Sequence, residues 1–269
     1  MEYNTVNMEN KDILSHLQWY LDSGVDETTG DETLDWFALS SSPAPKPALA
    51  VKTAPVISAD QIAQEAEKLA ADCNSLSDLN EVIKNFNGCR LKKTATHTVF
   101  ADGNPESDII IIGEAPGVDE DRQGIPFVGE GGHLLDKMFK AINLNRESDF
   151  YITNILPWRP PGNRAPTDEE ITICLPFIKR HIELFSPKLI ILLGGISAKS
   201  LLQTDTGITR LRGKWHDYDL ESGKVPVLPL FHPAYLLKQP KAKGDTWADL
   251  LSIKARLETL SPNNEEQAT

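Results

Sequence analysis

The stretch that decides the fold is Asp108–Gly117, DIIIIGEAPG, in which four consecutive isoleucines end at a turn rich in glycine and proline. An apolar run without polar alternation suits a strand that is buried on both faces, as in a parallel sheet. Three further runs of this kind follow along the chain: Phe150–Ile155 (FYITNI), Leu189–Leu193 (LIILL) and Pro226–Phe231 (PVLPLF). We therefore predict four buried strands, of which Asp108–Ile112 is the first.

Helical patterns lie before, between and after these runs. The predicted helices span residues 59–85, with a polar break near Asn74 and Ser75, and then residues 131–143, 168–185, 195–203 and 246–260. From the first strand onward, strand and helix alternate, and this order is typical of an open parallel sheet flanked by helices. The sequence thus predicts an α/β fold with an open parallel sheet flanked by helices.

The two ends of the chain differ in composition from this core. We predict an acidic N-terminal segment over residues 1–39, a flexible linker rich in Pro, Ala and Ser over 40–57, a folded domain over 58–260, and a disordered acidic tail over 261–269. The N-terminal segment contains a short amphipathic helical pattern at residues 10–21. This helix is either loosely docked or a binding motif for a protein partner.

The chain has 269 residues and a formal net charge of -12, but this charge is unevenly distributed. Residues 1–85 hold 15 acidic and 5 basic side chains, whereas residues 86–260 hold 22 of each. A basic groove for nucleic acid is therefore compatible with the middle of the chain. Only three cysteines, no long apolar run and no secretory leader are present, so we expect a monomeric cytoplasmic protein without a disulfide scaffold or a membrane span.

Polar side chains follow the predicted strands, at the edge where an open parallel sheet binds its ligands. The first strand leads into Gly113, Glu114, Ala115, Pro116, Gly117, Glu120 and Phe127, Asn154 ends the second, Gly194 and Gly195 follow the third, and His232 follows the fourth. The turn lets backbone N–H groups approach a ligand, a phenyl ring can stack on a base, an amide can read a pyrimidine edge, and a histidine can stabilise an oxyanion. Together they predict a pocket for a nucleobase whose bond to its sugar is broken.

These motifs resemble those of one enzyme family. The segments GEAPGVDEDRQGIPFVGEGGHLLDKM, ITNILPWRPPGNRAPTDEEITICLPF and HPAYLL are similar, in sequence and in order, to the motif series of family-four uracil-DNA glycosylases. The resemblance extends from Phe86 to Leu257. It implies a three-layer α/β/α sandwich with a central four-stranded parallel sheet. It also implies hydrolysis of the bond between uracil and deoxyribose in DNA, the first step of base excision repair.

The resemblance also implies a role for each residue of the pocket. Glu114 falls, with Gly113, Ala115, Pro116 and Gly117, in the motif for the catalytic water, Glu120 is a second carboxylate in that loop, Phe127 stacks on the flipped uracil, Asn154 reads the pyrimidine edge, and His232 stabilises the departing uracil anion. Tyr235 and Leu236 lie in the loop that enters the duplex, and Arg159, Arg164, Arg210, Arg212 and Lys214 are candidate phosphate contacts. Which of Glu114 and Glu120 activates water stays open, since Glu120 in the run DED also fits a solvated acid.

The chain departs from the family in its cysteines. The family pattern implies a four-iron cluster held by four cysteines, but Phe86 and Trp158 stand at two of these positions, and Cys89 and Cys174 remain at the others. Because two thiolates cannot hold a cubane cluster, we predict that no cluster and no other cofactor binds. We expect the two aromatic rings to fill the cluster volume beside reduced cysteines, with a softer metal or a disulfide as alternatives.

Three functions fit this sequence. The first is an active uracil-DNA glycosylase whose partner is uracil-containing DNA. The second is a non-catalytic DNA-binding or DNA polymerase-associated adaptor that retains the fold. The third is a glycosylase for another base, such as hypoxanthine or a damaged pyrimidine. Asn154 favours uracil, because an amide with one donor and one acceptor group fits the edge of that base.

Overall fold

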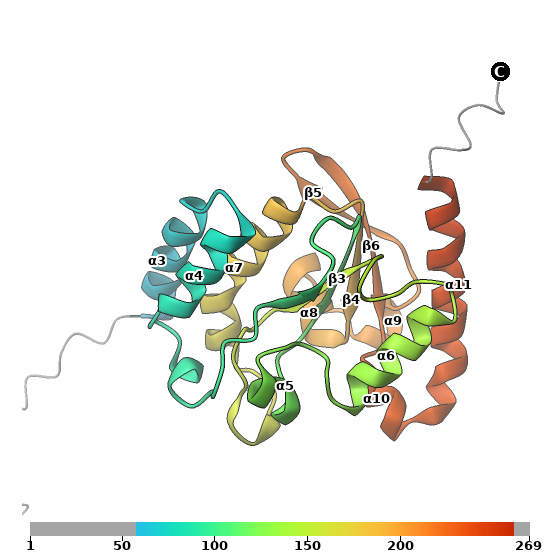
Figure 1. Ribbon diagram of the computed structural model, residues 1–269, viewed down its shortest axis with the longest axis horizontal. Coiled ribbons are helices and arrows are strands. Elements are labelled where there is room, and N and C mark those ends of the chain that lie inside the picture. The colour runs from blue at the N-terminus through green and yellow to red at the C-terminus, as the bar shows by residue number, and fades with distance from the viewer. Residues whose placement is uncertain (1–57, 261–269) are drawn as a thin grey trace, which may run out of the picture. The chain divides into compact units, whose positions relative to one another are not determined.

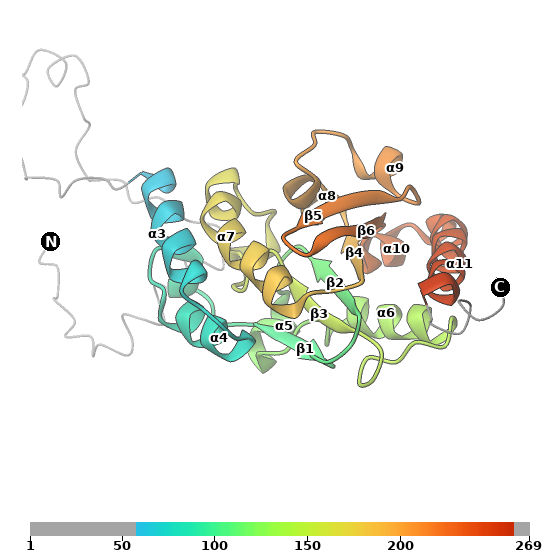
Figure 2. The same ribbon diagram turned by 90° about the horizontal axis from the view of Figure 1, so that it is seen from above.

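The computed structural model describes residues 58–260, and the predictions for the N-terminal segment, the linker and the acidic tail lie outside these residues. Figures 1 and 2 label most of the elements. In chain order they are α3 (Ala59–Ala71), α4 (Leu76–Asn85), the 3-10 turn η1 (Arg90–Lys93), β1 (Ala101–Gly103), β2 (Ile109–Gly113), α5 (Val118–Gln123), α6 (Glu130–Lys140), β3 (Tyr151–Asn154), η2 (Pro161–Asn163), α7 (Asp168–Phe185), β4 (Leu189–Leu193), α8 (Gly195–Leu202), α9 (Ile208–Leu211), β5 (His216–Leu220), β6 (Gly223–Leu230), α10 (Pro233–Lys238), η3 (Pro240–Ala242) and α11 (Lys243–Leu260).

A six-stranded sheet with the strand order β1-β3-β2-β4-β6-β5 forms the middle layer. Its four inner strands are the four predicted ones, and they run parallel to one another. Ile111 of β2 lies between Ile152 of β3 and Ile191 of β4 in this register. Every residue of β2 and β4 is buried, as their unbroken apolar runs require. The predicted α/β fold is therefore confirmed.

The sheet is wider than the four-stranded sheet that we predicted. β1 pairs antiparallel with β3 at one edge, and β5 pairs antiparallel with β6 at the other. β1 has only three residues, and β5 alternates between half-buried and exposed residues. An edge strand meets water along one side, so it needs no unbroken apolar run, and the pattern used for the inner strands misses it.

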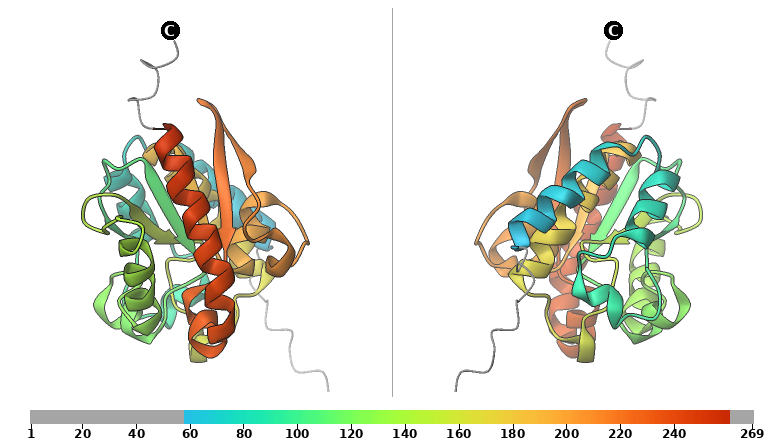
Figure 3. Two further views of the ribbon diagram at one scale, coloured as in Figure 1. Left: turned by 90° about the vertical axis from the view of Figure 1, so that its right-hand side faces the viewer. Right: turned by 90° about the vertical axis from the view of Figure 1, so that its left-hand side faces the viewer.

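Helices cover both faces of the sheet (Figures 2 and 3). On one face α3, α4, α7 and α8 enclose a core that includes Ile110, Ile190 and Phe177. On the other face α6 and α11 pack against Ile111 and Ile191. The pattern over residues 59–85 gives two helices, because Ser75 caps the start of α4 at the predicted polar break. Among residues 58–260, no helix is long and apolar enough to cross a membrane.

Candidate active site

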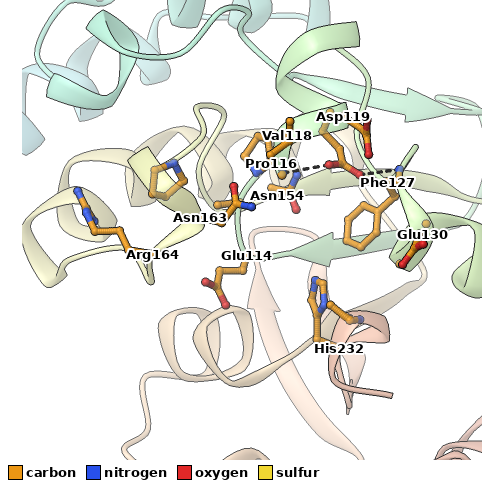
Figure 4. Close-up of a pocket in the computed structure, with 18 of the residues that line it drawn as sticks. Glu114, Pro116, Val118, Asp119, Phe127, Glu130, Asn154, Asn163, Arg164 and His232 are labelled. Atoms are coloured by element: carbon orange, nitrogen blue, oxygen red, sulfur yellow. Dashed lines mark hydrogen bonds between the residues drawn. The ribbon is translucent and has the colours of Figure 1, made fainter. Parts of the chain in front are cut away.

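A cavity of about 610 Å³ opens at the carboxyl ends of the inner strands (Figure 4). Of the residues that the sequence predicts for the pocket, its lining includes Glu114, Ala115, Pro116, Gly117, Glu120, Phe127, Asn154, Arg164 and His232. They come from segments that are far apart in the chain and meet because β2, β3 and β6 end at the same edge. Lys238, Asn163 and Gly131 also line the cavity. Asn163 and Gly131 lie within the quoted motifs but were given no role, and Lys238 lies just after the last motif.

Phe127 forms one wall of the cavity. Its backbone adopts φ +54°, a left-handed conformation that costs a non-glycine residue about 1–3 kcal/mol. Its ring lies 5.7 Å from the ring of His232, measured between centroids. A Cβ atom at Gly113 would lie 2.5 Å from the Cζ atom of Phe127 and would also collide with Asn154 Oδ1. Gly113 therefore lines no surface itself, but it is the residue that lets Phe127 and Asn154 approach each other.

Asn154 ends β3 directly beside Gly113 of β2. Its side chain is buried, and within residues 58–260 nothing donates a hydrogen bond to its carbonyl oxygen Oδ1. A buried acceptor without a donor costs about 1–3 kcal/mol, so such atoms are usually reserved for a ligand or for water. Because Asn154 itself lines the cavity, its unpaired amide oxygen indicates a ligand that presents an N–H group there.

His232 lies opposite Phe127, at the first turn of α10. The backbone N–H of Ala234 donates to His232 Nδ1 at 3.2 Å, so in the neutral ring the hydrogen sits on Nε2. Burial lowers the pKa of His232 to about 4, although the charge of Glu120 acts in the opposite direction. At neutral pH the side chain is therefore an uncharged hydrogen-bond donor, aligned by the start of its own helix.

Glu120 has a backbone-binding role. Its Oε2 accepts the N–H of Gly117 at 3.1 Å, and its Oε1 accepts the N–H groups of Val128 and Gly129 at 3.1 and 2.9 Å. One carboxylate thus joins the turn after β2 to the loop that carries Phe127. These three accepted hydrogen bonds distinguish Glu120 from the free, solvated acid that the run DED also fits.

Glu114 is different, because no residue within 58–260 donates a hydrogen bond to its carboxylate. It lines the cavity directly after β2, and burial raises its pKa above the ordinary value for a glutamate. A carboxylate that is half-desolvated and unbound is a better proton acceptor than one that is hydrogen-bonded. The two acids thus differ in their hydrogen bonds, and which of them activates water stays a prediction.

The predicted duplex-entering residues divide by exposure. Leu236 is fully buried, so the prediction that it contacts DNA is wrong. The reason is that these residues form α10, and neighbouring residues of a helix face different sides. Tyr235 and Leu237 are the large hydrophobic side chains that α10 exposes, at 43% and 40%.

The candidate phosphate contacts also divide. Arg212 donates to the carboxylate of Asp249 and to the backbone carbonyl of Asp245, and stacks on Phe231 at 5.5 Å. It is held inside the protein and is not free for a phosphate, contrary to the prediction. Arg164 lies at the cavity, where Glu170 accepts from both terminal nitrogens at 2.6 and 2.8 Å.

Three cations remain from the predicted phosphate contacts. Arg159 donates to Asn163 Oδ1 at 2.6 Å. Arg210 and Lys214 are exposed, as expected of cations that can reach a ligand in solvent. The basic side chains near the cavity are thus fewer than the sequence suggested, and Arg164 with Lys238 are the ones on its wall.

The four positions of the family's cluster lie in one buried core, and they hold no set of four thiolates. The ring of Phe86 packs edge-on against Phe177 at 4.9 Å, and the indole N–H of Trp158 donates to Thr98 at 3.0 Å. Cys89 and Cys174 are free and buried, and the neighbouring Cys89 thiol, together with burial, raises the pKa of Cys174.

Within residues 58–260, no three side chains of His, Cys, Asp or Glu gather in a metal-binding arrangement. A phenyl ring and an indole supply no ligand for iron, so this donor set does not fit a four-iron cluster.

Comparison with known proteins gives a consistent result. The sequence model of the uracil DNA glycosylase superfamily matches residues 100–251. The type-4 uracil-DNA glycosylase of Archaeoglobus fulgidus is 39% identical over 183 residues, 66% of this chain and 92% of that protein. That of Sulfurisphaera tokodaii is 36% identical over 185 residues, 67% of this chain and 84% of that protein. A DNA polymerase of Bacillus phage SP01 is 33% identical over 174 residues, 65% of this chain but only 18% of the polymerase. The resemblance predicted from the motifs is confirmed.

Proposed function

The chain belongs to the uracil DNA glycosylase superfamily, and we propose that it hydrolyses the N-glycosidic bond between uracil and deoxyribose in DNA, leaving an abasic site. The observation that carries this proposal is the unsatisfied Asn154 Oδ1, on a residue that lines the same cavity as the ring of Phe127 and the neutral donor His232. A flipped pyrimidine would find in this cavity a stacking surface, a reader for its edge and a donor for its anion.

Asn154 would select uracil by its pattern of donors and acceptors. Its Oδ1 accepts the N3–H of uracil, and its amide nitrogen donates to O4. Cytosine presents an acceptor at N3 and a donor at N4, so both contacts would be mismatched. A buried mismatch leaves polar groups unpaired, which disfavours cytosine by more than the loss of a contact alone.

The bond-breaking step would use His232 and Glu114. As the C1′–N1 bond breaks, its electron pair moves to uracil and the sugar becomes oxocarbenium-like. The Nε2–H of His232 would donate to the oxygen of uracil that gains negative charge, without giving up its proton. A water molecule then bonds to C1′ through its oxygen and loses a proton to the carboxylate of Glu114. Glu120 would hold the two loops in place.

The proposal has a direct test, which is excision from an oligonucleotide with one uracil, followed by alkaline cleavage at the abasic site. We expect the wild-type chain to excise uracil, and His232→Ala to lose about 100- to 1,000-fold in rate. His216→Ala is the matched control, because that histidine lies on the edge strand β5 and does not line the cavity. No excision by the wild-type chain from single-stranded, U:A or U:G substrates would overturn the proposal.

A second variant tests the reading of the base. Asn154→Asp places an acceptor where O4 of uracil needs a donor, and when protonated it can donate to N3 of cytosine. We expect its preference for uracil over cytosine to fall. An unchanged preference would show that Asn154 does not read the base.

We also propose that the chain works without an iron–sulfur cluster. Support comes from the packed aromatic side chains at two cluster positions and from the buried, free thiols of only two cysteines at the others. Purified protein should contain less than one iron per chain, and about four irons per chain would contradict this. The proposed mechanism needs neither a protein partner nor a second subunit. The monomeric state and a protein partner for the N-terminal helix stay predictions.

A further inference from the structure

Arg146 lies in the loop between α6 and β3, outside every motif used above. Its side chain is 14% exposed. Nη1 donates to the backbone carbonyl of Pro126 at 2.9 Å, and Nη2 donates to that of Phe127 at 2.8 Å. One guanidinium therefore binds the two successive carbonyl groups that flank the Phe127 α-carbon on its N-terminal and C-terminal sides.

Two carboxylates fix this guanidinium. Asp136 of α6 accepts from Nε at 3.0 Å and lies 2.9 Å from Nη2, while Asp102 of the edge strand β1 accepts from Nη1 at 3.1 Å. The planar arrangement of donors in arginine is thus fully engaged by protein acceptors. A side chain that is largely buried and bound in this way has no free donor for a DNA phosphate.

The segment that Arg146 holds is strained. Phe127 has φ +54°, a left-handed conformation that is unfavourable for phenylalanine and must be stabilised by contacts around it. On its other side the N–H groups of Val128 and Gly129 bind Glu120, and Gly132 packs so tightly on the Phe127 carbonyl that no larger residue fits. The backbone around Phe127 is therefore bound by two side chains of opposite charge: Arg146 binds its carbonyl groups, and Glu120 binds the N–H groups that follow.

We infer that Arg146 is a positioning residue for uracil excision, which holds the backbone of Phe127 so that its ring faces the cavity. This inference rests on the proposed function, because it assigns the stacking of the base to Phe127. Arg146 acts through Phe127 and touches neither the base nor the DNA. Replacing it frees the Pro126 and Phe127 carbonyls, and the loop relaxes toward negative φ with the ring displaced.

The test compares Arg146→Met and Arg146→Lys with Arg180→Met under single-turnover conditions on uracil-containing DNA. Arg180 is the matched control, since it also binds a backbone carbonyl, that of Cys73, and a carboxylate, that of Glu183, but on α7 away from the cavity. We expect Arg146→Met to slow excision about 100-fold, the usual cost of an ångström-scale misplacement, and Arg180→Met to stay within about twofold. Arg146→Lys, which keeps the charge but cannot bind both carbonyls, should fall between them.

A double-mutant cycle separates positioning from general stabilisation. In a Phe127→Ala background there is no ring to misplace, so adding Arg146→Met should slow excision by no more than about threefold further. An equal loss in both backgrounds would overturn the inference. So would a shallower salt dependence of DNA binding in Arg146→Met, because that is the signature of a lost phosphate contact.

Amide hydrogen exchange provides a readout without DNA. The amides of Val128 and Gly129 should exchange faster in Arg146→Lys than in the wild type. Unchanged exchange would contradict the inference that Arg146 holds the backbone of this loop. If the wild type and Arg180→Met excise no uracil, the proposed function fails and the role of Arg146 fails with it. If both excise uracil and the Arg146 variants match them, only the role of Arg146 fails.

Discussion

The active-site pocket and the buried region around Cys89 lie in the same domain, yet they depend on different properties of their side chains. In the pocket the direction of each polar atom matters: Asn154 Oδ1 is left without a partner, and Phe127 is held at positive φ. In the buried region Phe86 and Trp158 stand where the family has cysteines, and they fill space with rings. A side chain in the pocket must have the right polar atoms in the right direction, whereas a side chain in the buried region must have the right volume. Substitutions should therefore damage activity in the first region and stability in the second.

The largest effect that we predict is on stability in the buried region. Trp158 is among the largest fully buried side chains, and Trp158→Ala should lower the free energy of unfolding by about 3–5 kcal/mol. Excision by the folded fraction should stay within about threefold of the wild type, because the indole does not line the cavity. Urea unfolding with single-turnover assays checks both. Trp247→Ala is the control, since that indole is 46% exposed and should cost under about 1 kcal/mol.

The reverse pattern is expected at Gly113. The added methyl group of Gly113→Ala would collide with the Phe127 ring and with Asn154 Oδ1, so we expect excision to slow about 100-fold, equivalent to about 2.7 kcal/mol. Stability should fall less, by about 1–2 kcal/mol, because only one methyl group is added. Gly244→Ala, where a Cβ meets nothing within 4 Å, is the matched control for a glycine substitution. A rate within threefold of the wild type would show that the Phe127–Asn154 spacing is not limiting.

The same contrast explains what the sequence could predict. The inner strands follow from unbroken apolar runs, and the residues after them meet at one edge because parallel strands end together. The edge strands β1 and β5 could not be found in this way, since their outer sides need no apolar residue. The role of Arg146 could not be predicted from the sequence for a related reason. Its partners Pro126, Asp102 and Asp136 are distant in the chain, and only the tertiary structure brings them to it.

Roles of similar residue types were also beyond sequence reasoning. Glu114 and Glu120 lie six residues apart and look alike as acids, but only the backbone geometry shows that Glu120 accepts three N–H groups. Leu236 and Leu237 are neighbours of the same type, and the orientation of α10 decides that Leu236 is buried and Leu237 exposed. Sequence patterns identify the residues of a pocket more readily than they identify the direction of a side chain.

A buried histidine outside the pocket, His181, should make the stability of the folded protein depend on pH. His181 lies 3.1 Å from the Tyr151 hydroxyl and stacks on Phe100, and burial lowers the pKa of His181 to about 3. The unfolded chain takes up a proton below about pH 6.5, the folded chain only near pH 3, so stability is full above pH 6.5 and is lost as the pH falls. At pH 5 the expected loss is about 2 kcal/mol.

The variant His181→Gln isolates this effect, because glutamine does not titrate. Between about pH 7.5 and pH 5, the free energy of unfolding of the wild type should fall about 2 kcal/mol further than that of the variant. Urea unfolding at a series of pH values measures both curves. If the free energy of unfolding falls equally with pH in the wild type and in His181→Gln, burial does not keep His181 neutral in the folded protein.

The smallest effect on activity is expected when the lost ligands are put back. Phe86→Cys combined with Trp158→Cys restores four cysteines beside Cys89 and Cys174, and anaerobic incubation with iron and sulfide should then give a brown protein with about four irons per chain. The Ala–Ala version of the double substitution, with the same cavities but two thiols, should stay colourless. Since neither position lines the pocket, excision by the folded, loaded protein should stay within about twofold of the wild type. Iron uptake by the wild-type chain would contradict the cluster-free proposal. A strong effect of the loaded cluster on excision would show that the buried region and the pocket are coupled.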